Sequence, residues 1–273
     1  MFSKRTCKIM LLALLVYLLL ITFTTLSIIK SEMKPTVTAE DFIYMFTIVQ
    51  PFGFFDSLST YMSLLIFPVI GSFTSIFVKN NNELSNIIQR IGYNNFLKKA
   101  ALQAFLMGVT FSVISEIYRI ILINWNYAPI TFTEKSFYLF QSKNSFSNNS
   151  FIQLLLFMAT AAVGWGIFSV FIFACGLYVK KNAIFLISGE FIGLILLLLP
   201  TLYAMINPFL LAVANIVEIP TLVAPGLINM GSQGAPGGIM ITWVACALLY
   251  AFSAWILLTL WKKKAIANEL KGK

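Results

Sequence analysis

Four ionisable side chains stand in or next to long apolar stretches, where a charge must be paired, hydrated or neutralised. Glu116 and Arg119 are three residues apart, so a helix places both on one face, where they can form an ion pair. Glu190 follows Lys181 by nine residues, which is about 13 Å along a helix and close to the centre of a bilayer. Glu218 is the one charge in an apolar stretch that is broken by proline and glycine. These positions are candidates for a pathway or a gate inside a membrane.

Two of these sites leave an alternative open. Glu116 and Arg119 either form a structural ion pair near the outer membrane interface or line the outer mouth of a pathway, where they could meet a charged substrate. Glu190 either lines or gates a pathway or is a neutral carboxyl group, hydrogen-bonded to Ser188 or to a neighbouring span. An ionised carboxylate at this depth costs on the order of 3 kcal/mol on insertion scales, so it needs a partner, a wet cavity or a proton.

Several kinds of chemistry are excluded by the residues that the chain lacks. It has no histidine, and its three cysteines form no CxxC motif, which argues against a Ser-His-Asp triad, a disulfide framework and a metal site. It also has no GxxxxGK[ST] phosphate loop and no HExxH motif. We therefore expect no cofactor on this chain and no ATP hydrolysis by that route. An intramembrane protease or lipid transferase remains an alternative, with Glu116, Arg119 and Glu190 as its only polar candidates.

The elements that must position these residues are membrane spans. The chain has 273 residues, of which 59% are hydrophobic and 11% charged, whereas a soluble domain has about 25% charged residues. Apolar runs of about 20 residues are long enough to cross a bilayer as helices. We expect an all-α polytopic membrane protein that forms a single transmembrane domain over residues 1–273. Its six expected spans cover residues 9–29, 58–78, 100–123, 151–179, 183–199 and 239–261.

Prolines and glycines predict irregular segments. Pro68 and Gly71 predict a kink in the second span. The run from Phe42 to Phe55 is too short to cross, which favours an interfacial or re-entrant segment. Residues 201–238 contain four prolines and five glycines, which predicts re-entrant helical pieces at the outer face, between the fifth and sixth spans.

The polar stretch from Lys79 to Lys99 separates the second and third spans. Its apolar residues recur at helical spacing, which predicts an amphipathic helix at the inner membrane face with a break at Gly92. Such a helix either rests on lipid headgroups or transmits the movement of a cytoplasmic partner to the membrane domain. The candidates for contact with that partner are Glu83, Arg90, Gly92, Tyr93, Lys98 and Lys99.

Positive charges orient the chain in the membrane. Six spans put both termini on one side, and 14 of the 19 lysines and arginines lie on that side, against five on the other. By the positive-inside rule both termini are expected to be cytoplasmic. Because the basic residues stand beside spans, the net charge of +9 does not predict a nucleic-acid partner.

Taken together, the six spans, the segment Glu83…Arg90-Ile91-Gly92-Tyr93…Lys98-Lys99 and the proline-broken outer segment resemble the permease subunits of ABC-2-type exporters. The resemblance covers nearly the whole chain and is nearest to the small permeases of Gram-positive peptide exporters and lantibiotic-immunity systems. It implies that two such permeases, identical or related, form a dimer around a pathway. Two cytoplasmic ABC ATPase subunits, which carry the ATP and Mg²⁺, would bind underneath.

The resemblance also assigns roles to segments. The Lys79–Lys99 segment would be the coupling helix, and the pieces within 201–238 would form the outer gate. Only about eight residues precede the first span, so the amphipathic connecting helix found at the start of many family members is short or absent. Coupling would then depend more strongly on Lys79–Lys99.

The expected function is that of an export permease in the lipid bilayer of a bacterial plasma membrane. Few charges line the expected spans, which suits a hydrophobic or amphipathic substrate such as an antimicrobial or toxic peptide. Export and self-protection against such a peptide require the same chemistry. A membrane scaffold or sensor subunit that transports nothing is the remaining alternative.

Overall fold

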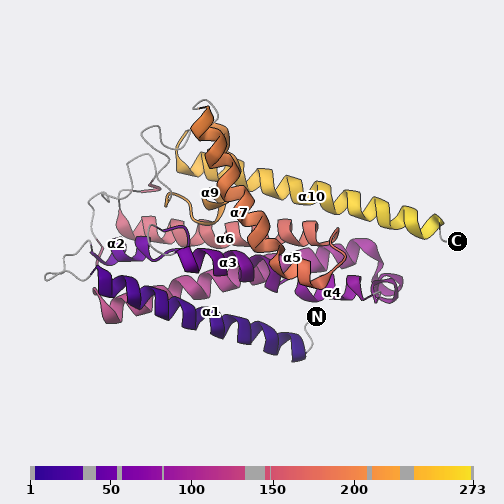
Figure 1. Ribbon diagram of the computed structural model, residues 1–273, viewed down its shortest axis with the longest axis horizontal. Helices are drawn as coiled ribbons and strands as arrows, with labels where there is room; N and C mark the ends of the chain where they lie inside the picture. Colours follow the sequence, from indigo (N-terminus) through magenta and orange to yellow (C-terminus); the bar gives the residue numbers. More distant parts are fainter. Residues whose placement is uncertain are drawn as a thin grey trace.

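The computed structural model describes residues 4–32, 41–53, 57–81, 83–132, 145–147, 149–207, 211–227 and 237–271. Within these residues every regular element is a helix, as the sequence predicts, and the helices form an elongated bundle (Figure 1). They are α1 (Lys4–Ser31), α2 (Asp41–Ile48), α3 (Ser57–Ile70), α4 (Phe73–Asn80), α5 (Leu84–Asn126), α6 (Ser150–Gly176), α7 (Asn182–Ile206), α8 (Leu211–Val217), α9 (Ile219–Val223) and α10 (Ile239–Lys271).

Five of the described helices, α1, α5, α6, α7 and α10, are long and apolar enough to cross a membrane. Their outer faces carry large apolar side chains, such as Leu19, Phe191 and Leu248, each with more than 60% of its surface exposed. Exposed apolar surface on this scale is unusual for a soluble protein and is what lipid-facing helices require. These helices indicate a membrane-embedded protein.

The helices α3 and α4 form a sixth candidate crossing if they are counted as one bent span. They meet at 61°, at the position where Pro68 and Gly71 predict a kink. Pro68 lacks the N–H group that would continue the helical ladder. The Gly71 carbonyl at the bend accepts a hydrogen bond of 2.8 Å from the side-chain amide of Gln103 on α5, so this backbone group is paired inside the protein.

The centre of the bundle is α6, which packs against α3, α5, α7, α9 and α10. The side chains of Trp165 and Phe168 are almost fully buried here, and Phe67 of α3 contacts Trp165 edge to face. Glycines on α6 let neighbouring helices approach closely, since a Cβ at Gly164 would collide with α9 and one at Gly166 with Phe105 of α5. The small residues of this span therefore serve packing.

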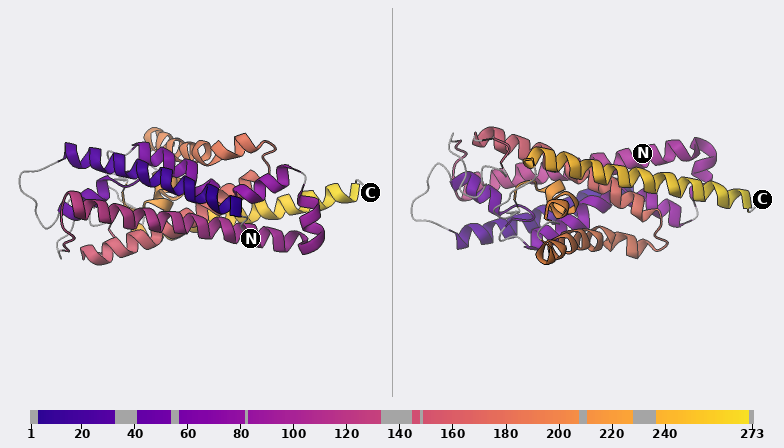
Figure 2. Two further views of the ribbon diagram at one scale, coloured as in Figure 1. Left: turned by 90° about the horizontal axis from the view of Figure 1, so that it is seen from below. Right: turned by 90° about the horizontal axis from the view of Figure 1, so that it is seen from above.

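The short helix α2 is buried rather than spread on a surface. It forms a second apolar cluster with the end of α1, the end of α5 and the beginning of α6, through residues such as Phe42, Phe46, Ile123 and Phe157. At this end of the bundle the Asn149 side chain caps α6 by accepting hydrogen bonds from two backbone N–H groups. The start of α1, the end of α10 and the α4–α5 connection lie toward the opposite end (Figures 1 and 2).

Several helix ends differ from the expected spans; α1, for example, begins at Lys4 rather than at residue 9. The fifth span was expected to stop before Pro200, but α7 includes this proline and continues to Ile206, packed against α8. The fourth was expected to reach residue 179, but α6 ends at Gly176, because Tyr178 and Val179 turn back onto the carbonyls of Cys175 and Gly176. The last helix, α10, continues ten residues beyond the expected end at residue 261.

Candidate functional site

A charged pair is buried in the last third of α5. Glu116 and Arg119 have only 4% and 1% of their surface exposed, and their side chains are 3.4 Å apart. Gln50, which follows α2, donates its amide N–H to the second carboxylate oxygen at 2.6 Å. The carboxylate thus has a partner on each oxygen, which is the condition under which a buried charge is tolerated.

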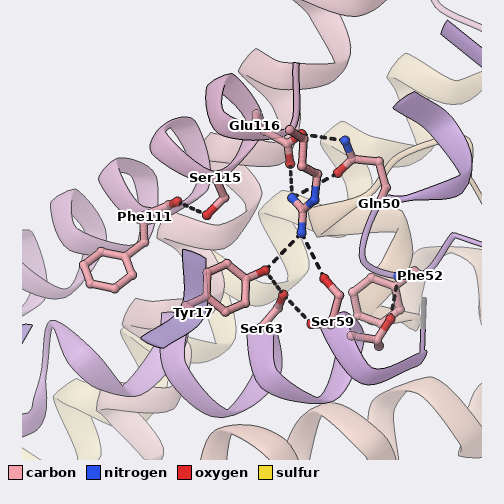
Figure 3. Close-up of polar contacts among 10 residues, drawn as sticks. Tyr17, Gln50, Phe52, Ser59, Ser63, Phe111, Ser115 and Glu116 are labelled. Carbon is pink, nitrogen blue, oxygen red and sulfur yellow. Dashed lines mark hydrogen bonds and ion pairs between the residues drawn. The ribbon is translucent and has the colours of Figure 1, made fainter. Parts of the chain in front are cut away.

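The Arg119 guanidinium connects this pair to two other helices. One of its terminal nitrogens donates to the hydroxyl of Tyr17 on α1 at 3.1 Å and to that of Ser59 on α3 at 2.9 Å (Figure 3). Ser63 donates to the Ser59 carbonyl, so the 2.5 Å contact between Tyr17 and Ser63 has Tyr17 as its donor. We call Tyr17, Gln50, Ser59, Ser63, Glu116 and Arg119 the polar network.

The polar network bears on the two interpretations of the Glu116–Arg119 pair. Its hydrogen bonds hold α1, α3, α5 and the residue after α2 in one arrangement, and both charges point at protein rather than at open space. This geometry favours the structural ion pair over a lining that meets a charged substrate. The sequence predicts only the charged pair of this network. Ser59 and Ser63, four residues apart in an apolar run, are the polar residues that could have indicated the rest.

Glu190 lies elsewhere, on α7, and is half-buried. The preceding Gly189 lies against the Leu64 carbonyl of α3, so Glu190 stands at the edge of the α3–α7 contact. Ser188, which is one of the two hydrogen-bond partners considered for a neutral Glu190, instead donates its hydroxyl to the Phe185 carbonyl in its own helix at 2.7 Å. Within the described part of the chain, no hydrogen bond or ion pair joins Glu190 to another side chain.

Glu218 is buried and occupies the residue before α9. Three side chains on one face of α10 contact backbone carbonyl groups at Glu218 and on both sides of it. Trp243 donates to the Leu222 carbonyl at 3.0 Å, Cys246 lies 3.8 Å from the Glu218 carbonyl, and Tyr250 donates to the Val217 carbonyl at 2.6 Å. Carbonyl groups at the ends of the short helices α8 and α9 are thereby paired inside the protein. Residues 208–210 and 228–236 of the expected outer gate lie outside the described residues.

The expected coupling segment, Lys79–Lys99, is not one helix: it is divided among the end of α4, a short helix over residues 84–91 and the beginning of the long part of α5 after Gly92. Residues 84–91 form the first part of α5, and Gly92, with φ 74° and ψ 158°, breaks the helix where the sequence predicts a break. Residues other than glycine rarely adopt this backbone conformation. Glu83, Arg90, Gly92, Lys98 and Lys99 are exposed, whereas Tyr93 is half-buried and its ring lies 6.1 Å from that of Trp261 on α10.

The end of α4, where this segment begins, is hydrogen-bonded to the connection between α6 and α7. The Lys79 ammonium of α4 donates to the carbonyls of Gly176, Leu177 and Val179 at 2.5–3.2 Å, where a positive charge also complements the end of the α6 dipole. Asn80 donates to Asn182 at 2.6 Å. The end of α4 and the beginning of α7 are therefore held together by side-chain hydrogen bonds. These fastening residues are not apparent from the sequence, because 97 to 102 positions separate the partners.

The chain matches no protein-family model, no curated protein and no solved structure. Within the described residues, no three His, Cys, Asp or Glu side chains are grouped so that they could hold a metal ion. The assignment of function therefore depends on the arrangement of the helices themselves.

Proposed function

We propose that this chain is the permease subunit of an ABC-2-type exporter, with ATP and Mg²⁺ bound and ATP hydrolysed by separate cytoplasmic ABC subunits. The observation that carries the proposal is the short amphipathic helix over residues 84–91, which has the exposed charges Glu83 and Arg90 at its two ends, is set off by Gly92, and follows a helix that is hydrogen-bonded to the α6–α7 connection. A partner that moves this segment would move membrane helices with it. The proposed assembly is two ATPase subunits and two permease chains, identical or related, in a bacterial plasma membrane.

The proposal includes six membrane crossings, with α3 and α4 counted as one. It also places both termini in the cytoplasm. This topology is supported by the positions of three parts of the chain. The beginning of α1, the last turn of α10 and the α4–α5 connection all lie toward the same end of the bundle (Figure 1). Exposed basic residues, among them Arg90, Lys99 and Lys264, gather toward this end. The positive-inside rule makes this the cytoplasmic end.

The proposed cargo is hydrophobic or amphipathic, with an antimicrobial or toxic peptide as the expected class. A cleft of about 260 Å³ between α7 and α8 supports this class of cargo. Its lining is apolar and includes Ile195, Leu199 and Pro200 from α7 and Val213, Ala214 and Val217 from α8. A cleft with this lining suits alkyl or aromatic groups and offers no charge to a polar solute. In the proposal, α8 and α9 form the outer gate as re-entrant pieces.

The coupling role is tested by Glu83→Ala and Arg90→Ala in the complex with its ATPase. If these exposed charges contact the partner, each replacement should weaken that contact by about 5- to 30-fold, the range for interface side chains that contribute ~1–2 kcal/mol. ATP hydrolysis that depends on this chain should fall accordingly, while insertion into the membrane stays normal. Lys263→Ala, which removes an exposed charge from α10, is the matched control.

The measurement is the rate of ATP hydrolysis and of cargo transport in reconstituted vesicles. Hydrolysis and transport at the unchanged rate in both variants would mean that residues 84–91 only rest on lipid headgroups.

A further inference from the structure

A groove of about 280 Å³ lies between α4 and the first half of α5. One side consists of Thr74, Ser75 and Val78 on α4, and the amphipathic helix before Gly92 contributes Ile87 and Ile91. The long part of α5, beyond the break at Gly92, closes the groove with Phe96, Lys99, Ala100 and Gln103. The bend at Gly71 and the break at Gly92 together set the angle between these walls.

The lining of this groove divides into a polar and an apolar part. Lys99 is its only ionisable residue, and two hydroxyl groups and the Gln103 amide stand with it in the lining. Gln103 uses its N–H group on the Gly71 carbonyl and the Thr74 hydroxyl, which fixes the direction of the amide. Val78, Ile87 and Ile91 form the apolar part. Within the described residues, no acidic side chain forms an ion pair with Lys99.

The position of the groove along the bundle is marked by aromatic residues. Tyr93, six residues before Lys99 on α5, contacts Trp261, which directly precedes Lys262, Lys263 and Lys264. Tyr and Trp next to a cluster of lysines are typical of the boundary between the hydrocarbon core and the cytoplasmic headgroups. Anionic lipid headgroups on the cytoplasmic side attract basic side chains at this level of a membrane.

We propose that this groove binds the phosphate group of an anionic phospholipid. The Lys99 ammonium makes the ionic contact with the phosphate, and the Thr74 and Ser75 hydroxyls stand within the same polar part of the lining. The first methylene groups of the acyl chains lie along Val78, Ile87 and Ile91. A groove of about 280 Å³ is at the lower end of the range for ligand pockets, which suits a headgroup with the start of its chains rather than a whole lipid. This inference goes beyond the transport proposal and does not require an ATPase.

Native mass spectrometry of the purified full chain tests this site, with phosphatidylglycerol or phosphatidylcholine added to the detergent solution. We expect phosphatidylglycerol to be retained at lower concentrations than phosphatidylcholine. Lys99→Gln should weaken its retention about fivefold, the contribution of one basic residue near an anionic surface. The matched control is Lys98→Gln, which removes the same charge from the adjacent exposed position outside the groove and should leave retention unchanged.

Three results would overturn the proposal. Equal losses in both lysine variants would show diffuse attraction to anionic lipid rather than a site. In a second experiment, inorganic phosphate is added alone. If it binds as tightly as phosphatidylglycerol, and if this binding depends on Lys99, the groove belongs to a soluble phosphate compound. Unchanged retention in Lys99→Gln, with loss of a co-purifying protein, would assign Lys99 to a protein partner.

Discussion

Replacing Arg119 with alanine is expected to destabilise the folded protein by about 3–5 kcal/mol, the usual cost of removing one partner from a buried ion pair. Glu116 would remain buried without a cation, and the hydroxyls of Tyr17 and Ser59 would each lose a charged donor. Either the carboxylate stays ionised in an apolar environment or it takes up a proton, and both outcomes are unfavourable. The measurement is the fraction of detergent-purified protein that remains monodisperse after heating. The variant should lose monodispersity at a lower temperature than the wild type.

A double variant separates a structural role from a transport role. In Arg119→Met with Glu116→Leu, both charges are replaced by apolar side chains of similar volume, and such replacements are often close to neutral for stability. We expect the double variant to recover most of the stability that Arg119→Ala loses. If it is stable and transports cargo normally, the pair is structural, as the polar network indicates. Wild-type stability in Arg119→Ala itself would contradict the network.

Gly164→Ala should have the second large effect, because the added methyl group has no space. It would collide with the backbone carbonyl of Leu222 on α9, which cannot rotate away as a side chain could. Overpacking of this kind costs about 1–3 kcal/mol when the surroundings can shift. Here a shift of α9 would also stretch the 3.0 Å hydrogen bond from Trp243 to the same carbonyl. We therefore expect a value at the upper end of this range, together with loss of cargo-stimulated ATP hydrolysis if α9 belongs to the outer gate.

Val163→Ala is the matched control for Gly164→Ala. Val163 is the adjacent residue on α6, and 37% of its surface is exposed, so its truncation should have little effect. The measurement is again the temperature at which the purified protein loses monodispersity, followed by ATP hydrolysis in the reconstituted complex. A Gly164→Ala protein with unchanged stability would show that α9 does not lie against α6.

Local features of this fold were predictable from the sequence, because proline, glycine and apolar runs act on their own neighbourhood. The bend beside Pro68 and Gly71 and the break at Gly92 are confirmed. Glu116 and Arg119 lie on one helical face, and their ion pair follows from a spacing of three residues. In each case the physical cause lies within one turn or two of the residue concerned.

Features that depend on distant segments were not predictable from a single sequence. Tyr17, Gln50 and Ser59 lie 60 to 102 positions from their partners in the polar network, so no local pattern relates them to Arg119 or Glu116. Ser188, one option for a hydrogen bond to Glu190, donates to its own helix because the backbone offers an acceptor within one turn. Fastening of α4 to the α6–α7 connection likewise depends on packing that only the folded chain provides.

The most direct test of the permease proposal is affinity purification of this chain from its native membrane in mild detergent, with the co-purifying proteins identified by mass spectrometry. We expect to recover a soluble ATPase that contains a phosphate loop, in equal numbers with the permease chains. We also expect this ATPase to be lost in the Glu83→Ala and Arg90→Ala variants but not in Lys263→Ala. Recovery of the chain alone, under conditions that preserve other membrane complexes, would contradict the proposal and turn attention to Glu190 as a catalytic acid.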